Sequence, residues 1–372
     1  MKSGFMFLVI NPAGNGDSLI LKSGETIVLV DGGTANSYAL WRDNAISFRR
    51  FDCVIATHID NDHVNGLMKL LLDLDKTKIQ IDECLYNGAS QILGFEDVNF
   101  TEEHEDDFNQ LTSNLEVLDG ESEIAASEGT SLSYLISKLG IKTNSSALHT
   151  SNCPNFNIGS LNFSTISPNI DTINNLKNQW LEVLRDDGIC HKVIGRSHKN
   201  AFEAYVKSLS AEFIEEEISS EKTTVEGLAD FNYKRDTSLA NQSSLAFLVT
   251  DENSSLLLLG DCHAESVLSW LDDNDKNELQ VDAIKLSHHG SKCNINKELV
   301  ERVKTETYVI STNGNKHSHP DLEVLSLIAK YGKSTTKNIY INYEIDHIED
   351  SFIKDLKKYS THVHMLTREI KL

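Results

Sequence analysis

The stretch THIDNDHVNG, residues 57–66, places two imidazoles and two carboxylates within six positions. These four side chains are His58, Asp60, Asp62 and His63. The stretch directly follows the apolar run FDCVIA and opens a segment with apolar residues at helical spacing, which predicts a tight turn between a strand and a helix. Several charged groups on one short turn are costly without a counter-charge, so the turn predicts a bound cation. In the alternative interpretation, Asp60 or Asp62 caps the helix and the histidines are incidental.

Two later apolar runs also end in residues that commonly bind metals. LLLLGD ends in Asp261, and AIKLSHHGS contains the adjacent histidines His288 and His289. Both runs predict buried strands, so three strand ends carry carboxylates or imidazoles. A dense group of both ligand types can bind two divalent ions side by side. One of the two adjacent histidines is expected to be a structural hydrogen-bonding group, and the sequence leaves open which one.

The whole chain has 372 residues, of which 40% are hydrophobic, enough for one large domain or two medium domains. With 34 basic and 56 acidic residues, its formal net charge is −22, which excludes a general nucleic-acid binder with a basic surface. A polyanionic substrate would need local basic groups or bound cations. Scattered cysteines without a C-x-x-C pair and the lack of a long apolar run predict a reduced, cytoplasmic protein without a membrane span.

Strand-like and helix-like segments alternate along the chain in a way that indicates an α/β fold. Strand patterns occupy the first third and return after residue 244, and each block is followed by helical patterns. This order predicts two mixed sheets with helices on their outer faces. Residues 170–237 read as a mainly helical insertion or cap, and no composition shift marks a boundary, so we expect residues 1–372 to form a single domain.

The order of the motifs resembles that of a known family. THIDNDHVNG looks like a variant of the H-x-H-x-D-H signature of the metallo-β-lactamase fold. The full order is GDSLIL, VLVDGG, THIDNDHVNG, ISP, NQSSLAFLV, LLLLGD, KLSHHGSK and HSHP. It is similar to the branch that contains the hydrolase domain of the DNA-uptake protein ComEC and its soluble relatives. The resemblance covers most of residues 4–330, apart from the insertion, and implies an αββα sandwich.

The resemblance also implies a set of metal ligands. They would be His58, Asp60, Asp62, His63, Asp261 and His288, with His289 as the competing candidate for the last place. His58 and Asp60 would hold the first ion, Asp62 and His63 the second, and Asp261 would bridge them. His288 would complete the shell of the second ion. Asp60 replaces the usual second histidine, and a carboxylate there makes Mn²⁺ or Mg²⁺ suitable beside Zn²⁺.

The resemblance points to further residues around the ions. Those that would orient ligands, line the cleft or supply positive charge are Asp17, Asp31, Asn241, Ser244, Lys292 and Lys316. The two aspartates could equally be ordinary strand-end or turn residues. His319, which precedes a proline, could contact a phosphate or protonate a leaving group, or it could belong to a plain surface turn. Many family members supply another histidine before the bridging aspartate, and His104 and His149 occupy that interval here.

These observations predict a metal-dependent hydrolase, with a nucleic acid or nucleotide phosphodiester as substrate. Asp62 and Asp261 would hold the attacking water and His319 would act as the acid. The acidic net charge is an objection to a free-standing nuclease, because polyanion binding relies on Lys and Arg. One alternative is a small substrate, such as a cyclic nucleotide, a phosphocholine ester or a lactone. Another is a component of a bacterial defence or DNA-processing assembly, in which residues 170–237 bind a protein partner or a second copy.

Overall fold

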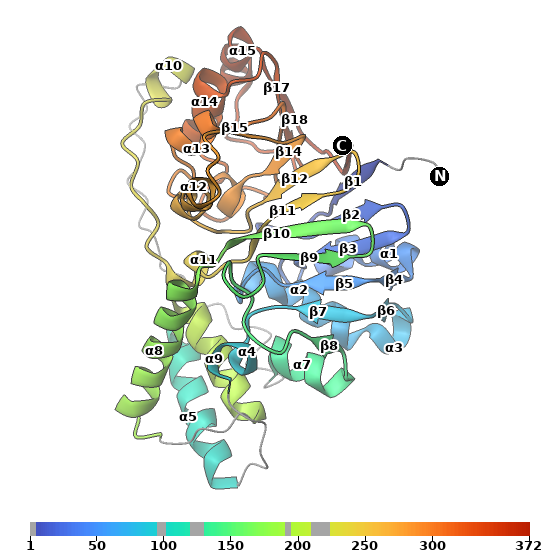
Figure 1. Cartoon of the computed structure of the whole chain (residues 1–372), viewed down its shortest axis with the longest axis vertical. Helices are drawn as coiled ribbons and strands as arrows, with labels where there is room; N and C mark the ends of the chain where they lie inside the picture. The colour runs from blue at the N-terminus through green and yellow to red at the C-terminus, as the bar shows by residue number, and fades with distance from the viewer. Residues whose placement is uncertain (1–4, 95–101, 120–129, 190–194, 210–223) are drawn as a thin grey trace.

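Two β-sheets packed face to face form the centre of the computed structural model, which describes residues 5–94, 102–119, 130–189, 195–209 and 224–372 (Figure 1). The first sheet has the order β19 (Glu369–Lys371), β1 (Met6–Ile10), β2 (Leu19–Ser23), β3 (Thr26–Val30), β5 (Cys53–Ile55), β7 (Glu83–Leu85) and β8 (Lys142–Thr143). Its strands are antiparallel from β19 to β3 and parallel from β3 to β8.

The second sheet is also mixed. Its order is β18 (Thr361–His364), β17 (Lys337–Ile341), β16 (Thr307–Ile310), β14 (Ala283–Lys285), β12 (Ser255–Leu258), β11 (Ala246–Thr250), β10 (Leu161–Ser167) and β9 (Asn155–Ile158). Strands β9 to β12 are antiparallel, and β12 to β18 are parallel. Two short pairs lie beside the sheets, β4 (Arg50–Phe51) with β6 (Gln80–Ile81) and β13 (Leu279–Gln280) with β15 (Val303–Lys304).

The core between the sheets follows from the alternation of side chains along each strand. In β3, Val28 and Val30 lie in the cluster between the sheets, whereas Leu29 lies in the cluster on the outer face. In β12, Leu256 and Leu258 lie between the sheets. Successive side chains of a strand point to opposite faces, so an uninterrupted apolar run requires burial on both sides. These runs therefore produce the sandwich that the sequence predicts.

Helices cover the outer faces of both sheets. The first outer layer contains α1 (Tyr38–Phe48), α2 (Asn61–Leu72), α3 (Leu74–Thr77), α4 (Ala89–Leu93) and α7 (Leu132–Leu139). The second contains α12 (Ala264–Asp273), α13 (Lys297–Arg302), α14 (Leu322–Tyr331) and α15 (Asp350–Lys358). With helices outside two mixed sheets, the αββα class is confirmed.

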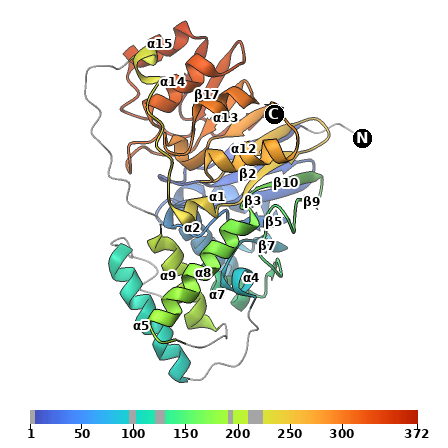
Figure 2. The ribbon, with the colours of Figure 1, turned by 60° about the vertical axis from the view of Figure 1, so that its left-hand side comes forward.

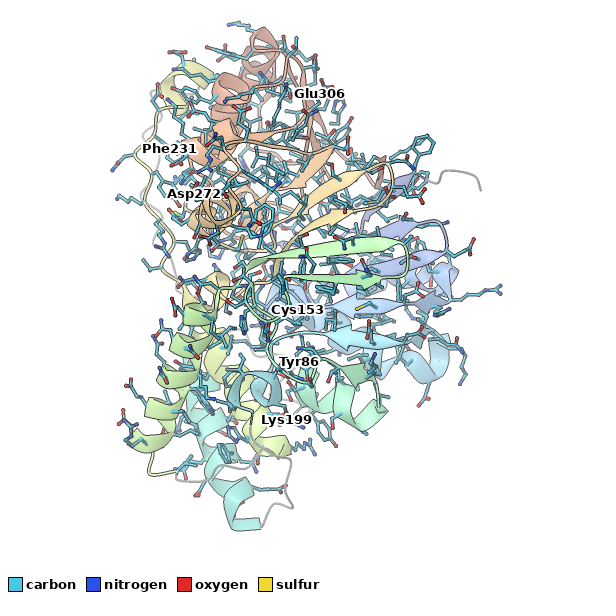
Figure 3. The ribbon with its side chains drawn as sticks, in the orientation of Figure 1. Tyr86, Cys153, Lys199, Phe231, Asp272 and Glu306 are labelled. Carbon is cyan, nitrogen blue, oxygen red and sulfur yellow. The ribbon has the colours of Figure 1, made fainter. Side chains whose placement is uncertain are left out.

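A group of longer helices extends the first outer layer. It consists of α5 (Glu102–Asp119), α8 (Ile170–Asp186) and α9 (Arg196–Ser208), at the bottom of Figure 1. Trp180 of α8 and Phe202 of α9 are fully buried and belong to the same apolar cluster as the outer face of the sheet. Tyr86, labelled in Figure 3, is part of this cluster at the end of β7. The acidic segment that contains α5 thus contributes Phe108 to this packing.

The described parts of residues 170–237 contact both halves of the sandwich. Helices α8 and α9 belong to the first layer, but α10 (Val225–Leu228) packs beside α14 and α15 in the second (Figure 2). The backbone N–H of Val225 donates to the Asp355 carboxylate of α15 at 2.8 Å. This stretch therefore contacts two separate helical layers.

Two elements near the C-terminus were not expected from the sequence. Helix α15 buries only Phe352 and Leu356 and is otherwise mostly polar. Strand β19 is short and adds an edge strand beside β1, where Leu8 lies opposite Ile370. None of the described helices is both long enough and apolar enough to cross a bilayer.

Candidate metal centre

The turn after β5 holds the first set of candidate ligands. β5 ends at Ile55, and α2 begins at Asn61 with Asp60 as its N-cap residue. The Asp60 carboxylate accepts a hydrogen bond from the Asn61 backbone N–H at 2.6 Å. The capping alternative is therefore correct for Asp60.

The first turns of α2 pack closely against the two glycines of the VDGG loop, Gly32 and Gly33. The Gly32 backbone N–H donates to the His63 carbonyl at 2.8 Å, and the Gly66 N–H donates to the Gly33 carbonyl at 2.9 Å. A Cβ added to Gly66 would lie 1.8 Å from the Gly32 carbonyl oxygen, a distance that no packing adjustment of a side chain could relieve. These contacts fix the helix that carries Asp62 and His63.

Replacing Gly66 by alanine is expected to displace α2 and to lower the free energy of unfolding by about 3 kcal/mol, the upper range for overpacking. Urea unfolding monitored by circular dichroism measures this change. Lys69→Ala on the same helix is the control, and its half-buried side chain should cost less than about 0.5 kcal/mol. A Gly66→Ala protein as stable as the Lys69→Ala protein would contradict the described contact.

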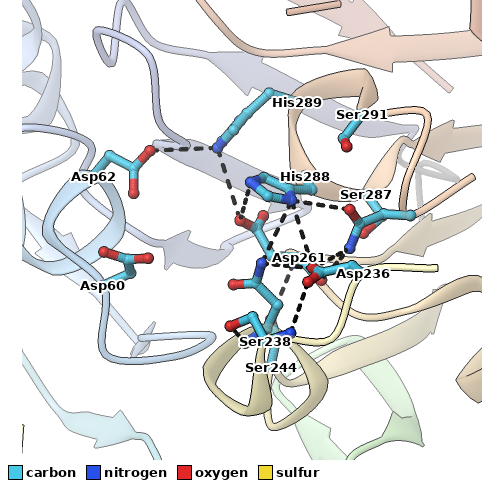
Figure 4. Close-up of polar contacts among 12 residues, drawn as sticks. Asp60, Asp62, Asp236, Ser238, Ser244, Asp261, Ser287, His288, His289 and Ser291 are labelled. Atoms are coloured by element: carbon cyan, nitrogen blue, oxygen red, sulfur yellow. Dashed lines mark hydrogen bonds and ion pairs between the residues drawn. The ribbon is translucent and has the colours of Figure 1, made fainter. Parts of the chain in front are cut away.

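Four imidazoles converge on one oxygen of Asp261. The distances to Asp261 Oδ2 are 3.3 Å from His63 Nε2, 3.8 Å from His58 Nε2, 3.8 Å from His288 Nε2 and 3.9 Å from His289 Nε2. Asp62 lies on the far side of His289, with its Oδ2 3.6 Å from the His289 Nε2 (Figure 4). The three strand ends singled out in the sequence therefore meet at one centre.

The other ring nitrogen of three of these histidines has an acceptor. His63 Nδ1 lies 2.9 Å from the Asp31 carboxylate, and His289 Nδ1 lies 2.9 Å from the Ser311 carbonyl. His58 Nδ1 lies 3.1 Å from the Thr57 hydroxyl oxygen, and that hydroxyl donates to Asp31 at 2.7 Å. Each Nδ1 therefore carries a hydrogen, and in the neutral ring each Nε2 carries the lone pair.

The atoms that face the middle of the cluster are buried without a hydrogen-bond partner among the described residues. They are the Nε2 atoms of His58, His63 and His289 and the Oδ1 of Asp261. Buried polar atoms are normally paired, and each unpaired one costs free energy. Converging lone pairs with no donor between them fit a divalent cation.

Charges inside the cluster raise the pKa of two histidines and lower the pKa of Asp261. Burial lowers the pKa of His63, but the Asp261 and Asp31 carboxylates outweigh burial and raise that pKa well above its usual value. For His289, burial is likewise outweighed, chiefly by Asp261, and the pKa rises to about 9. Burial raises the pKa of Asp261, but the histidines around it hold the pKa well below its usual range. The cluster therefore attracts positive charge.

Residues 11–112 match the family described as the metallo-β-lactamase superfamily, a range that includes the whole turn with His58 and His63. This part of the chain is similar to the metallo-β-lactamase superfamily. The family match covers about a quarter of the 372 residues, and the candidate ligands Asp261 and His288 lie beyond it. The match supports the predicted metal-dependent hydrolase.

Two curated proteins are similar to part of this chain. ComE operon protein 3 of Bacillus subtilis (strain 168) is 29% identical over 97 residues, which cover 26% of this chain and 12% of that protein. Recombination protein 2 of Haemophilus influenzae is 27% identical over 106 residues, which cover 28% of this chain and 13% of that protein. The matches support the ComEC-like branch that the motif order predicts, and they span only about an eighth of each relative.

Two solved structures are also similar to the chain, with low TM-scores. The metallo-β-lactamase fold protein YhfI from Bacillus subtilis has a TM-score of 0.42 and 11% identity, with 100% of both chains covered. CmlA, a diiron β-hydroxylase from Streptomyces venezuelae, has a TM-score of 0.41 and 11% identity, with 100% of this chain and 54% of that chain covered. Both TM-scores are too low to carry chemistry from one protein to another.

The predicted ligands fall into two overlapping groups. One group is His58, His63 and Asp261, and the other is Asp62, His63 and His289. Within each group the candidate ligand atoms lie within 4.8 Å of one another. Asp60 belongs to neither group, and His288 contacts Asp261 with a side chain that is 24% exposed. Both adjacent histidines thus face the Asp261 carboxylate.

The two residues predicted to orient ligands, Asp17 and Asp31, and the two predicted to line the cleft, Asn241 and Ser244, all contact candidate ligands. Asp31 accepts hydrogen bonds from the Thr57 backbone and side chain and contacts His63 Nδ1. Asp17 lies 3.4 Å from His289 Nδ1. The Ser244 hydroxyl oxygen accepts from the Asp261 backbone N–H at 3.1 Å. Asn241 Nδ2 lies 3.4 Å from His288 Nδ1. The structure therefore brings these four residues next to the centre.

The predicted acid, His319, is buried near the centre, whereas the two predicted basic residues, Lys292 and Lys316, lie in other environments. His319 is buried beside His288, with their ring centroids 5.5 Å apart. The Lys292 ammonium donates to Glu323 at 3.1 Å, so its charge is partly offset by that carboxylate. Lys316 lies on an exposed loop ahead of His319.

The two alternative histidines do not join the ligand groups in the described residues. His149 precedes β9, and its Nδ1 accepts a hydrogen bond from the Ser151 backbone at 3.2 Å. That bond gives His149 a local structural partner. The side chain of His104, in α5, lies outside the described residues.

Four residues near the centre were missed from the sequence. They are Asn15, Asp236, Lys285 and Asn294. Asn15 Nδ2 donates to Asp62 at 2.6 Å, and the buried Lys285 ammonium donates to Asp17 at 2.5 Å. The glycine-containing loop NPAGNGDS was a usable signal, because a Cβ on Gly16 would lie 1.6 Å from the Asp62 carbonyl oxygen. The other three have no distinctive local pattern.

Proposed function

We propose that this domain is a two-metal hydrolase of phosphodiesters, with a nucleic acid or a nucleotide as substrate. The observation that carries the proposal is the set of unpartnered, buried Nε2 atoms around Asp261. The superfamily match supports metal-dependent hydrolysis, and the similarity to Recombination protein 2 supports a nucleic-acid substrate. In the cell, we expect the protein to act in the cytoplasm.

Two ions fit the overlapping ligand groups better than one. The lone pair of one imidazole serves a single ion, and His63 belongs to both groups. If His63 joins Asp62 and His289 at one ion, His58 and Asp261 remain for the other, with Asp60 beside them at the N-cap. Three carboxylates make the donor set hard enough for Mn²⁺ as well as Zn²⁺, with Mg²⁺ as a third choice.

The protein groups have separate tasks in the proposed reaction. Divalent ions held here would supply an activated water and offset the charge of the phosphodiester. Asp62 and Asp261 would hold that water, and Asn15 fixes the Asp62 carboxylate by its hydrogen bond. His319 would deliver a proton to the leaving oxygen from the His288 side of the centre. Its Nδ1 lies 3.4 Å from the Asp321 carboxylate, which orients the ring.

A substrate panel tests the proposed function. Protein reconstituted with Mn²⁺ or Zn²⁺ would be assayed on single- and double-stranded DNA, RNA, cyclic nucleotides, a phosphocholine ester and a lactone. We expect cleavage of the nucleic acids or nucleotides that disappears on chelation and returns with the metal. Hydrolysis of the lactone alone would contradict a phosphodiesterase.

The net charge of −22 favours a second candidate, the hydrolysis of a small substrate. Two divalent ions add about four positive charges, and they add them only at the site. Binding of a polyanion normally requires many cationic contacts along its length. Cleavage of a cyclic nucleotide or phosphocholine ester without cleavage of DNA or RNA would favour this candidate. If nucleic acid is cleaved only with a partner present, residues 170–237 would be the proposed docking segment, for a protein partner or a second copy.

The role of His319 predicts a dependence on the leaving group. His319→Ala is expected to slow esters with alkyl-alcohol leaving groups about 100-fold, but nitrophenyl esters less than about threefold, because nitrophenolate leaves without protonation. Steady-state kcat values for the two ester types measure the difference. Equal losses for both types would show that His319 does not protonate the leaving oxygen.

A further inference from the structure

A buried polar network contacts His288 at Nδ1, the ring nitrogen that faces away from Asp261. The proposed reaction assigns no role to this network. Asp236 is 1% exposed and Asn294 is 0% exposed. The Asp236 carboxylate accepts hydrogen bonds from Asn241 Nδ2 at 2.8 Å, from Asn294 Nδ2 at 3.0 Å and from the Ser238 backbone N–H at 2.8 Å. A buried carboxylate with so many donors holds its neighbours in fixed orientations.

The bonds of Asn294 determine which of its atoms faces His288. Asn294 Nδ2 donates to Asp236 and also to the Asp261 backbone carbonyl, at 3.0 and 3.1 Å. The amide nitrogen is thereby used, so its Oδ1 accepts from His288 Nδ1 at 2.9 Å. This bond assigns the hydrogen to Nδ1 and leaves the His288 Nε2 lone pair facing Asp261.

The backbone directs the two adjacent histidines to different sides of Asp261. His288 and His289 have φ values of 45° and 55°, a left-handed conformation that is uncommon for residues with a Cβ. Their rings are 5.8 Å apart and inclined by 73°. His289 approaches Asp62, whereas His288 lies on the side of Asp236 (Figure 4). One ring therefore cannot simply replace the other.

We propose that Asn294 and Asp236 are positioning residues that aim the His288 imidazole at the metal centre around Asp261. The inference rests on the proposed two-metal function. Asn294 joins the His288 ring to the Asp261 backbone, so one side chain sets the spacing of two candidate ligands.

Metal stoichiometry tests this inference without an activity assay. Equilibrium dialysis against Zn²⁺ or Mn²⁺, followed by elemental analysis, would compare the wild type with His288→Ala and Asn294→Leu. We expect two ions per wild-type chain. For Asn294→Leu, one ion should bind about 10- to 100-fold more weakly and the other should be unaffected. His288→Ala should lose the same ion, and added imidazole should restore it.

Asn144→Leu is the matched control. The Asn144 amide makes three hydrogen bonds to the backbone of Tyr86 and Ser146 and none of these three reaches a candidate ligand. This variant should lose stability but keep both ions, so a general folding defect can be recognised by thermal unfolding.

The outcomes separate the inference from the proposed function. Two ions bound with wild-type affinity by His288→Ala or Asn294→Leu would overturn the inference and leave the two-metal function intact. A wild type that binds only one ion would overturn the two-metal function. In that case, unchanged affinity of His288→Ala for the single ion would also overturn the role of His288, whereas its loss would retain His288 as a ligand.

Discussion

Replacement of both Asp62 and His63 by alanine is expected to reduce phosphodiester cleavage by about 10³-fold or more. The expected loss corresponds to about 4 kcal/mol of transition-state stabilisation. A metal centre that stabilises negative charge in the transition state contributes an amount of this size. His63 Nε2 is the nearest of the four imidazole nitrogens to the Asp261 carboxylate, at 3.3 Å, and Asp62 Oδ2 lies 3.6 Å from His289 Nε2. The double substitution therefore removes two members of one ligand group. Single-turnover cleavage by metal-reconstituted protein measures the loss.

The control for this double substitution changes the same residue types elsewhere. Asp273 is exposed at the end of α12, and His362 lies on β18, the outermost strand of the second sheet. The Asp273→Ala and His362→Ala double variant should cleave within about twofold of the wild type, as expected of surface changes. Cleavage that survives the loss of Asp62 and His63 would exclude the proposed centre as the catalytic site.

The second large effect is expected at Asp261, the carboxylate that we propose bridges the two ions. Asp261→Asn keeps the shape of the side chain but removes the negative charge that faces four Nε2 atoms at 3.3 to 3.9 Å. Two ions held close together repel each other unless an anionic group lies between them. We therefore expect the metal content to fall from two ions to one or none and the cleavage rate to fall by about 10³-fold. Elemental analysis and cleavage rates provide the two readings.

Asp251→Asn serves as the matched variant for Asp261→Asn. Asp251 lies in the turn between β11 and β12, at the opposite end of β12 from Asp261, and hydrogen-bonds to Ser23. Its metal content should equal that of the wild type. Retention of two ions by Asp261→Asn would show that Asp261 does not bridge them.

Much of the sandwich could be predicted because its strands are buried on both faces. Val28, Leu29 and Val30 are buried on both faces of one strand. An uninterrupted apolar run of this kind can be recognised from the local sequence alone. Strand β19 and helix α15 could not be found this way. Each buries few apolar side chains, and β19 depends on pairing with β1 at the far end of the chain.

Some residues of the candidate centre could be predicted from their local sequence, whereas others depend on contacts with distant parts of the chain. His58, Asp62, Asp261 and the adjacent histidines follow apolar strands, so their position at a sheet edge could be inferred. The role of Asn294 could not be inferred from the sequence. Its hydrogen-bond partners, Asp261 and Asp236, lie 33 and 58 positions earlier in the chain. Asp60 shows the limit of motif reasoning, because the same carboxylate fits a ligand and an N-cap, and the structure shows the cap.

Anomalous diffraction from crystals grown with Mn²⁺ or Zn²⁺ tests the central claim most directly. Data collected on both sides of the metal absorption edge locate the ions independently of the protein atoms. We predict two anomalous peaks on either side of the Asp261 carboxylate, one near His58 and the other near Asp62 and His289. A saturated crystal with no peak at Asp261, or with its metal bound elsewhere, would contradict the two-metal centre.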